Sequence, residues 1–199
     1  MLAAIVFVMA GYLIGSISFA VVSSRMFGLP DPHTYGSGNP GATNVLRTGN
    51  KAAAITTLVG DAAKGFAAVA LAMHFGPPFE TPFWTVPAVA LATFIGHLYP
   101  VFHRFSGGKG VATAAGIILA LHWPLGLALL AVWLAIAFGF RLSSLAALVA
   151  AMFAPAGAFY VFGNTLIAWT MVPIAALLFW RHRANIRSLI TRNERQIGN

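Results

Sequence analysis

The longest polar stretch of this sequence, Tyr35–Gly49 (YGSGNPGATNVLRTG), contains residue types that bind anions. Its glycines let backbone N–H groups turn toward an anion, and a following helix start adds unpaired N–H groups and the positive end of a dipole. The hydroxyls of Ser37 and Thr43 and the guanidinium of Arg47 would complete a phosphate cradle. A glycine-rich turn between two helices explains the local sequence equally well.

The segment Gly107-Gly108-Lys109-Gly110 is a second candidate for phosphate binding, because it directly precedes a predicted helix. Lys109 would supply a mobile ammonium group. The segment is not a Walker A loop, since Gly110 follows the lysine where Ser or Thr is required. His97 and His103 flank it without a second ligand at metal spacing, so we predict no metal site.

Asp61 and Lys64 are three residues apart in an apolar helix and therefore share one face. Charges within a membrane usually mark function, but they also need a partner. We interpret the two as a self-neutralising pair that fixes helix packing, with a functional role as the alternative.

Polar residues near two further helix ends complete the candidate set. Ser144 lies at a predicted helix start, where capping is the default role. His182 and Asn185 are three residues apart on a predicted continuation of the last helix, and so face the same way. A basic tail on lipid headgroups accounts for the neighbouring arginines, but less well for the His/Asn pair.

The composition is that of an integral membrane protein. Of 199 residues, 59% are hydrophobic and 8% charged, whereas a soluble domain has about 25% charged residues. The absence of cysteine excludes disulfides and thiolate chemistry. We attribute the net charge of +8 to cations on the cytoplasmic side of a membrane and not to nucleic-acid binding.

We predict an all-α bundle that forms a single domain over residues 1–199, with seven transmembrane helices. The helices are expected at about 2–24, 51–75, 83–102, 111–121, 125–140, 143–162 and 165–180. A span needs about 20 apolar residues, and the fourth segment is shorter, so five spans are the alternative.

The charges predict the orientation. Loops on one side of the membrane contain nearly all Lys and Arg residues, whereas Glu80 is the only charged residue in the turns on the other side. The populated side is therefore cytoplasmic, which places the N-terminus outside and the C-terminus in the cytoplasm. Both glycine-rich segments then open to the same compartment.

Several activities are disfavoured by what the sequence lacks. It contains no G-x-S-x-G motif and no His-x4-Asp motif, and none of its four acidic residues lies in a glycine-rich segment. A magnesium-dependent phosphotransferase is therefore a weak alternative. An organic-phosphate transporter would use the same cradle, but it needs access from both faces, and the non-cytoplasmic turns are short and lack cations.

The chain resembles the PlsY family, the bacterial acyl-phosphate:glycerol-3-phosphate acyltransferases, over nearly its whole length. The matching segments are Gly11–Ser16, Gly36–Arg47, Asp61-x-x-Lys64-Gly65, Gly96-His97, Pro100–Phe102, Gly107–Thr113, Ser144-Leu145, Arg181-His182 and Asn185-Ile186. The first loop and the Gly-Gly-Lys-Gly-Val-Ala-Thr string together are highly specific. Ser106, Ser188 and Arg192 depart from the family pattern, while Glu194 matches it, and we assign no site role beyond Asn185.

This resemblance implies transfer of a fatty acyl group from acyl phosphate to the 1-hydroxyl of glycerol 3-phosphate. The products are lysophosphatidic acid and inorganic phosphate, in the first acylation of bacterial phospholipid synthesis. Acyl phosphate is already activated, so positioning and charge stabilisation suffice, and no cofactor is expected. The implied partners are both substrates and membrane lipid, with a soluble supplier of acyl phosphate as a further candidate. The implied location is the bacterial inner membrane, with the site facing the cytoplasm.

The resemblance also implies residue roles. The residues assigned to catalysis are Ser37, Lys109 and His182. The residues assigned to substrate binding are Gly38, Thr43, Asn44, Arg47, Gly107, Gly108, Ser144 and Asn185. His182 has a suitable intrinsic pKa for a general base, and a phosphate oxygen of the substrate is the alternative proton acceptor.

Overall fold

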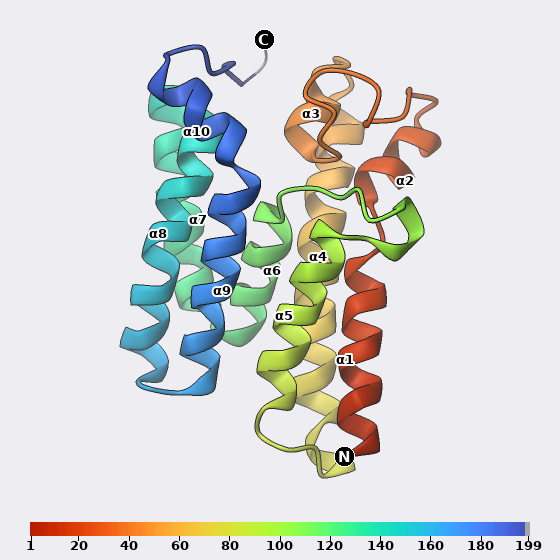
Figure 1. The fold of residues 1–199 in the computed structure, drawn as a ribbon, viewed down its shortest axis with the longest axis vertical. Coiled ribbons are helices and arrows are strands. Elements are labelled where there is room, and N and C mark those ends of the chain that lie inside the picture. Colours follow the sequence, from red (N-terminus) through yellow and green to blue (C-terminus); the bar gives the residue numbers. More distant parts are fainter. Residues whose placement is uncertain (198–199) are drawn as a thin grey trace.

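The computed structural model of the chain describes residues 1–197, so the last two residues of the predicted domain 1–199 lie outside the described part. Helices α1, α4 and α5 pack together, α7, α8 and α9 form a second group, and α6 lies between the groups (Figure 1). The long helices are α1 (Leu2–Gly15), α4 (Lys51–Phe75), α5 (Thr85–Leu98), α6 (Val111–Leu121), α7 (Trp123–Phe140), α8 (Ser143–Phe162) and α9 (Leu166–Arg181). The shorter elements are α2 (Phe19–Met26), α3 (Ala42–Leu46), η1 (Pro77–Phe79), η2 (Val101–His103) and α10 (Arg183–Ile190).

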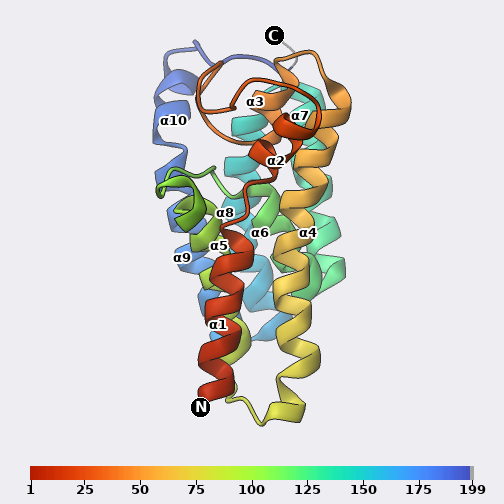
Figure 2. The same cartoon turned by 90° about the vertical axis from the view of Figure 1, so that its right-hand side faces the viewer.

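The prediction of an all-α membrane bundle is confirmed, but the prediction of seven spans is not. Within the described residues, 4 helices are long and apolar enough to span a membrane, or 5 if α1 and α2 form one bent span. The 11 residues of α6 rise only about 17 Å, roughly half of a hydrocarbon core of about 30 Å. Both views place the start of α6 below the level of α3 and α10 (Figure 2). The loop before α6 therefore reaches into the bundle.

The first predicted span, 2–24, is wrong as one continuous helix, because α1 and α2 meet at a 44° bend. The bend is tied to α4 through the backbone at Ile17, whose carbonyl accepts a hydrogen bond from Lys64 Nζ at 2.6 Å. Lys64 Nζ also lies 2.8 Å from Asp61 Oδ1, as the pairing interpretation predicts. The break in the helix thus supplies a second partner for a buried ammonium group.

Glycines allow the closest helix contacts of the bundle. A side chain at Gly65 on α4 would collide with the backbone of Thr113, and one at Gly116 on α6 would collide with the backbone of Ala62. A side chain at Gly15 on α1 would collide in the same way with the backbone of Thr93 on α5, so small residues allow this close contact as well. These contacts fix α6, and the loop that precedes it, against α4.

Helix α7 begins at Trp123, two residues before the predicted start at 125. Pro124 is tolerated there because the first N–H groups of a helix have no partner within the helix. His122 caps α7 by accepting a hydrogen bond from the Leu125 N–H.

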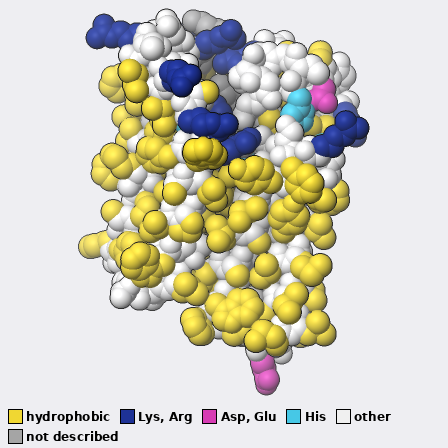
Figure 3. All heavy atoms as spheres, in the orientation of Figure 1, with side chains coloured by type: hydrophobic (Ala, Val, Ile, Leu, Met, Phe, Trp, Pro, Cys, Tyr) yellow, Lys and Arg dark blue, Asp and Glu magenta, His cyan; other side chains and the backbone are white. Residues whose placement is uncertain are grey.

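Cationic residues gather at one end of the molecule. On the face shown in Figure 3, Lys and Arg side chains cluster near the end that carries α10, and hydrophobic side chains cover most of the remaining surface. Residue 1 lies at the opposite end, and α10 lies at the cationic end (Figure 1). The two glycine-rich segments and the tail therefore share the polar end of the bundle.

Asn44 organises the first glycine-rich loop. Only 2% of the residue is exposed, and its Oδ1 accepts hydrogen bonds from the Ser37 N–H (2.9 Å) and from Arg47 Nη1 (3.2 Å). Its Nδ2 donates to the carbonyls of Pro32 (2.9 Å) and Tyr35 (3.2 Å). The Asn44 amide is occupied by hydrogen bonds within the loop, which gives it an architectural role, and its contact with substrate stays a prediction.

We predict that Asn44→Asp loosens this loop without unfolding the bundle. The substitution keeps the size of the side chain but turns the Nδ2 donor into an acceptor that faces two carbonyls. An unsatisfied buried group costs about 1–3 kcal/mol, so amide hydrogen exchange over residues 35–45 should accelerate about tenfold or more. Asn39→Asp, with the same charge change at a partly exposed position of the loop, is the matched control. Equal exchange in both variants would contradict the role of Asn44.

Candidate active site

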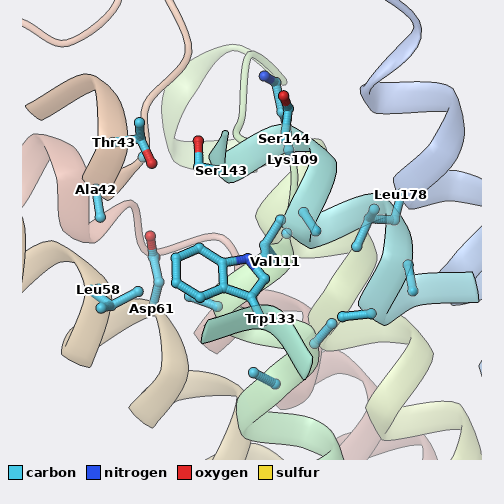
Figure 4. Close-up of a pocket in the computed structure, with 18 of the residues that line it drawn as sticks. Ala42, Thr43, Leu58, Asp61, Lys109, Val111, Trp133, Ser143, Ser144 and Leu178 are labelled. Carbon is cyan, nitrogen blue, oxygen red and sulfur yellow. The ribbon is translucent and has the colours of Figure 1, made fainter. Parts of the chain in front are cut away.

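One cavity of about 650 Å³ connects the polar end of the bundle to its apolar interior (Figure 4). Its polar part is lined by residues from the first loop, the loop before α6, the start of α8 and the tail. Its apolar part lies among α4, α6, α7, α8 and α9, with Leu58, Val111, Ile118, Trp133, Met171 and Leu178 among the lining residues. A ligand that fills it must have a polar head and an apolar chain.

Most of the predicted site residues meet at this cavity. Those that line it are Ser37, Thr43, Asn44, Arg47, Lys109, Ser144, His182 and Asn185. They come from segments far apart in the sequence, and the fold brings them together at the polar end. Gly38, Gly107 and Gly108 are not among the lining residues.

The predicted role of the Gly107 and Gly108 amides is wrong in part, because Gly108 already donates its N–H to the His97 carbonyl at 3.2 Å. Gly108 lies between the His97 ring and the Pro40 carbonyl of the first loop, where no side chain would fit. Arg181 donates to the carbonyls of Gly107 and Gly108. Gly108 allows the two loops to approach each other, and Arg181, predicted to be part of a lipid-facing tail, holds the second loop through these two carbonyls.

Lys109 belongs to a chain of short hydrogen bonds that joins four segments. Its Nζ donates to Asn185 Oδ1 at 2.6 Å, and Asn185 Nδ2 donates to Glu194 Oε1 at 2.6 Å. Ser144 Oγ donates to the same Glu194 oxygen at 2.6 Å. The carboxylate of Glu194 therefore orients both an amide and a hydroxyl that line the cavity.

The tail beyond Asn185, to which the sequence assigned no site role, contributes residues to the cavity. Glu194, Arg195 and Ile197 line the cavity, and the Ile197 N–H donates to the Arg141 carbonyl at 2.7 Å. The match of Glu194 to the family pattern was the signal that would have identified it. The neighbouring departures at Ser188 and Arg192 obscured that signal.

His182 does not continue the last helix as predicted, because it occupies the break between α9 and α10. Only 2% of the residue is exposed, and its Nδ1 donates to the Leu178 carbonyl at 2.9 Å, which leaves Nε2 as an acceptor. Burial, and then the charge of Lys109, lower the pKa of His182 to about 4. The imidazole is therefore neutral at pH 7 and is a weak base.

Lys109 retains its charge at neutral pH with a small margin. Its pKa is lowered to about 8, chiefly by burial; Glu194 opposes this shift, and the charges of Arg47 and Arg181 add to it. A bound phosphate would raise this pKa again, because an opposite charge favours the ammonium form. The cavity thus offers a cation whose charge responds to a bound anion.

A second polar cluster supports the site from beneath. His97 Nδ1 lies 3.6 Å from Asp61 Oδ1 and 3.1 Å from Thr113 Oγ1. Thr113 Oγ1 also donates to the Asp61 carbonyl at 3.0 Å. The sequence prediction left His97 out of this cluster, although it joins the Asp61–Lys64 pair to the loop that carries Lys109.

The arrangement can bind two anionic groups at its polar end and one acyl chain in its apolar part. The cations Arg47 and Lys109 line the polar part together with the hydroxyls of Ser37, Thr43 and Ser144. Such groups stabilise phosphate and developing negative charge in a site shielded from water.

Comparisons with known proteins all identify the same family. The family model for glycerol-3-phosphate acyltransferase matches residues 5–192. A glycerol-3-phosphate acyltransferase of Cupriavidus pinatubonensis is 62% identical over 99% of this chain and 98% of its own length. One of Burkholderia vietnamiensis is 60% identical over 96% of this chain and 89% of its own length.

The fold gives the same result. The crystal structure of PlsY (YgiH), an integral membrane glycerol 3-phosphate acyltransferase, in its glycerol 3-phosphate form aligns with a TM-score of 0.90 and 37% identity. That alignment covers 98% of this chain and 96% of the other. Its lysophosphatidic acid form aligns with a TM-score of 0.86 and 36% identity, over 98% and 95% of the two chains. This chain therefore belongs to the PlsY family of glycerol-3-phosphate acyltransferases.

Proposed function

We propose that this protein transfers a fatty acyl group from acyl phosphate to the 1-hydroxyl of glycerol 3-phosphate. The observation that carries the proposal is the single cavity in which a cationic polar part is continuous with an apolar part among the helices. Acyl phosphate has the matching form, a phosphate joined to an alkyl chain. The family and its solved members support glycerol 3-phosphate as the acceptor.

In this proposal the two phosphates occupy different parts of the polar end. Ser37, Thr43 and Lys109 hold the phosphate of the acyl donor and stabilise it as it leaves. The residues that hold glycerol 3-phosphate are Arg47, Ser144, His182 and Asn185. Glu194 acts through Asn185 and Ser144, since its carboxylate accepts a hydrogen bond from each.

The proton of the attacking hydroxyl goes to a phosphate oxygen. His182 has a pKa of about 4, whereas a phosphate monoester binds a proton with a pKa of about 6. The phosphate of glycerol 3-phosphate is such a monoester and is the stronger base by about two pKa units. His182 then orients the hydroxyl through its neutral Nε2, and Glu194 is already engaged by Ser144 and Asn185.

In this proposal the protein lies in the bacterial inner membrane, and its polar end faces the cytoplasm. The cations at this end and the acidic residue in the opposite turn support the orientation. Donor and acceptor then both reach the site from the cytoplasm, where a soluble enzyme would supply the acyl phosphate.

We predict that purified wild-type protein forms lysophosphatidic acid from acyl phosphate and glycerol 3-phosphate in the presence of a metal chelator. Lys109→Ala should lower kcat/KM at least about 100-fold, because it removes a charge from the developing phosphate. Arg104→Ala, an exposed cation in the same loop outside the cavity, is the matched control.

Equal product formation by Lys109→Ala and Arg104→Ala would contradict the site assignment. Uptake of glycerol 3-phosphate into proteoliposomes without acyl transfer would instead support a transporter.

The pH dependence should report the charge of Lys109. Its pKa of about 8 means that the ammonium form predominates below pH 8 and is lost above it. Because kcat/KM reports groups of the free enzyme, its value for acyl phosphate should be nearly constant around pH 7 and about half as large at pH 8. It should then fall toward tenfold per pH unit, while kcat changes less, since bound phosphate raises the pKa.

Lys109→Arg provides the control for this profile, because a guanidinium keeps its charge throughout the range. Any residual activity of this variant should show no decline between pH 8 and 9.5. A decline of the same size in the variant would assign the inflection to another group.

A further inference from the structure

Trp133, at the middle of α7, lines the cavity and has an unused hydrogen-bond donor there. Its Nε1 is buried and has no hydrogen-bond partner. An indole N–H can only donate, and buried donors in folded proteins nearly always have an acceptor. The unpartnered donor therefore indicates an acceptor that arrives with a ligand.

Trp133 is distinguished from the other buried groups that lack a hydrogen bond. Ser24 Oγ, Tyr35 Oη and Thr85 Oγ1 belong to residues outside the cavity lining. Asp61 Oδ1 belongs to a lining residue, but it lies 2.8 Å from the Lys64 ammonium and is neutralised there. Among the described residues, Trp133 alone brings an uncommitted buried donor to the cavity.

The position of the indole decides which acceptor fits. Figure 4 shows the ring across the cavity, with its nitrogen on the side of Val111. Val111 is the first residue of α6 and follows Lys109 by two positions. The Trp133 donor thus lies where the polar lining around Lys109 passes into the apolar lining of the helices.

An acyl phosphate has one acceptor at the corresponding place. With its phosphate at Lys109 and its alkyl chain among the helices, the acyl carbonyl oxygen lies at the boundary between them. Water and lipid chains offer poor alternatives, because this part of the cavity is apolar and hydrocarbon has no acceptor.

We propose that Trp133 is a catalytic residue whose Nε1–H donates to the acyl carbonyl oxygen and stabilises the oxyanion of the tetrahedral transition state. This inference rests on the proposed acyl transfer. The glycerol hydroxyl oxygen forms a bond to the acyl carbon, and the bond to phosphate breaks with its electron pair on the phosphate. The hydroxyl proton ends on phosphate, and the indole proton stays on Trp133.

The test compares Trp133→Phe with Trp123→Phe. The first removes the N–H and keeps an aromatic ring in the cavity wall. The second makes the same change on the same helix at a residue that is 66% exposed and outside the cavity. Loss of one oxyanion donor should lower kcat on the order of 10²- to 10³-fold, with an unchanged KM for glycerol 3-phosphate.

Acyl phosphates of different chain length distinguish a catalytic role of Trp133 from a packing role. Under the proposal, Trp133→Phe loses the same factor of kcat with short- and long-chain acyl phosphates. A loss that depends on chain length, or activity within twofold of Trp123→Phe, would overturn the proposal and leave Trp133 as part of the wall. Absence of acyl transfer by the wild type would instead show that the proposed function itself fails.

A binding measurement covers the case in which Trp133→Phe does not fold. The protein has 5 tryptophans, so the indole N–H signal of Trp133 can be assigned in labelled wild type through substitution of the other four. An acyl phosphonate, which retains the carbonyl, should shift this signal downfield. An alkyl phosphonate of equal length, which lacks the carbonyl, should not, and equal shifts from both would refute the hydrogen bond.

Discussion

The structure depends on keeping the Lys109 ammonium charged inside an apolar bundle. Burial is the main cause that lowers its pKa to about 8, so partners must hold the charged side chain in place. The chain from Lys109 through Asn185 to Glu194, with Ser144 on the same carboxylate, provides them. It also joins the loop before α6, the start of α8, α10 and the tail, so one set of polar contacts assembles the site from segments that helix packing alone would leave independent.

Backbone proximity is the second requirement. Gly65 and Gly116 let α4 and α6 meet at backbone distance, and Gly108 lets the two glycine-rich loops meet. Arg181 then bonds the carbonyls beside Lys109. The short α6 places this loop within the bundle, next to the apolar cavity. The same geometry that brings a cation beside the apolar lining of the cavity leaves room for an alkyl chain next to it.

The sequence was sufficient for what depends on composition and local pattern. Hydropathy predicted the bounds of α4 and α8, and the family resemblance assigned Ser37, Arg47, Lys109 and Asn185 to one site; all four line the same cavity. It was insufficient where contacts between residues far apart in the sequence determine the structure. The α1–α2 break follows from a lysine 47 positions away, and Glu194 reaches Ser144 across 50 positions. Gly107 and Gly108, which were predicted to bind an anion, instead take part in hydrogen bonds within the protein. The Gly108 N–H donates to the His97 carbonyl, and the carbonyls of both glycines accept from Arg181.

The central claim is that the acyl chain of the donor lies in the cavity while its phosphate lies at Lys109. Photolabelling tests this most directly, with a long-chain acyl phosphonate that carries a diazirine along its chain. We predict adducts on cavity-lining residues of α4, α6 and α7, such as Leu58, Ile118 and Leu130. These adducts should be lost in Lys109→Ala. Adducts confined to lipid-facing residues such as Phe138, at the same level in wild type and variant, would contradict the claim.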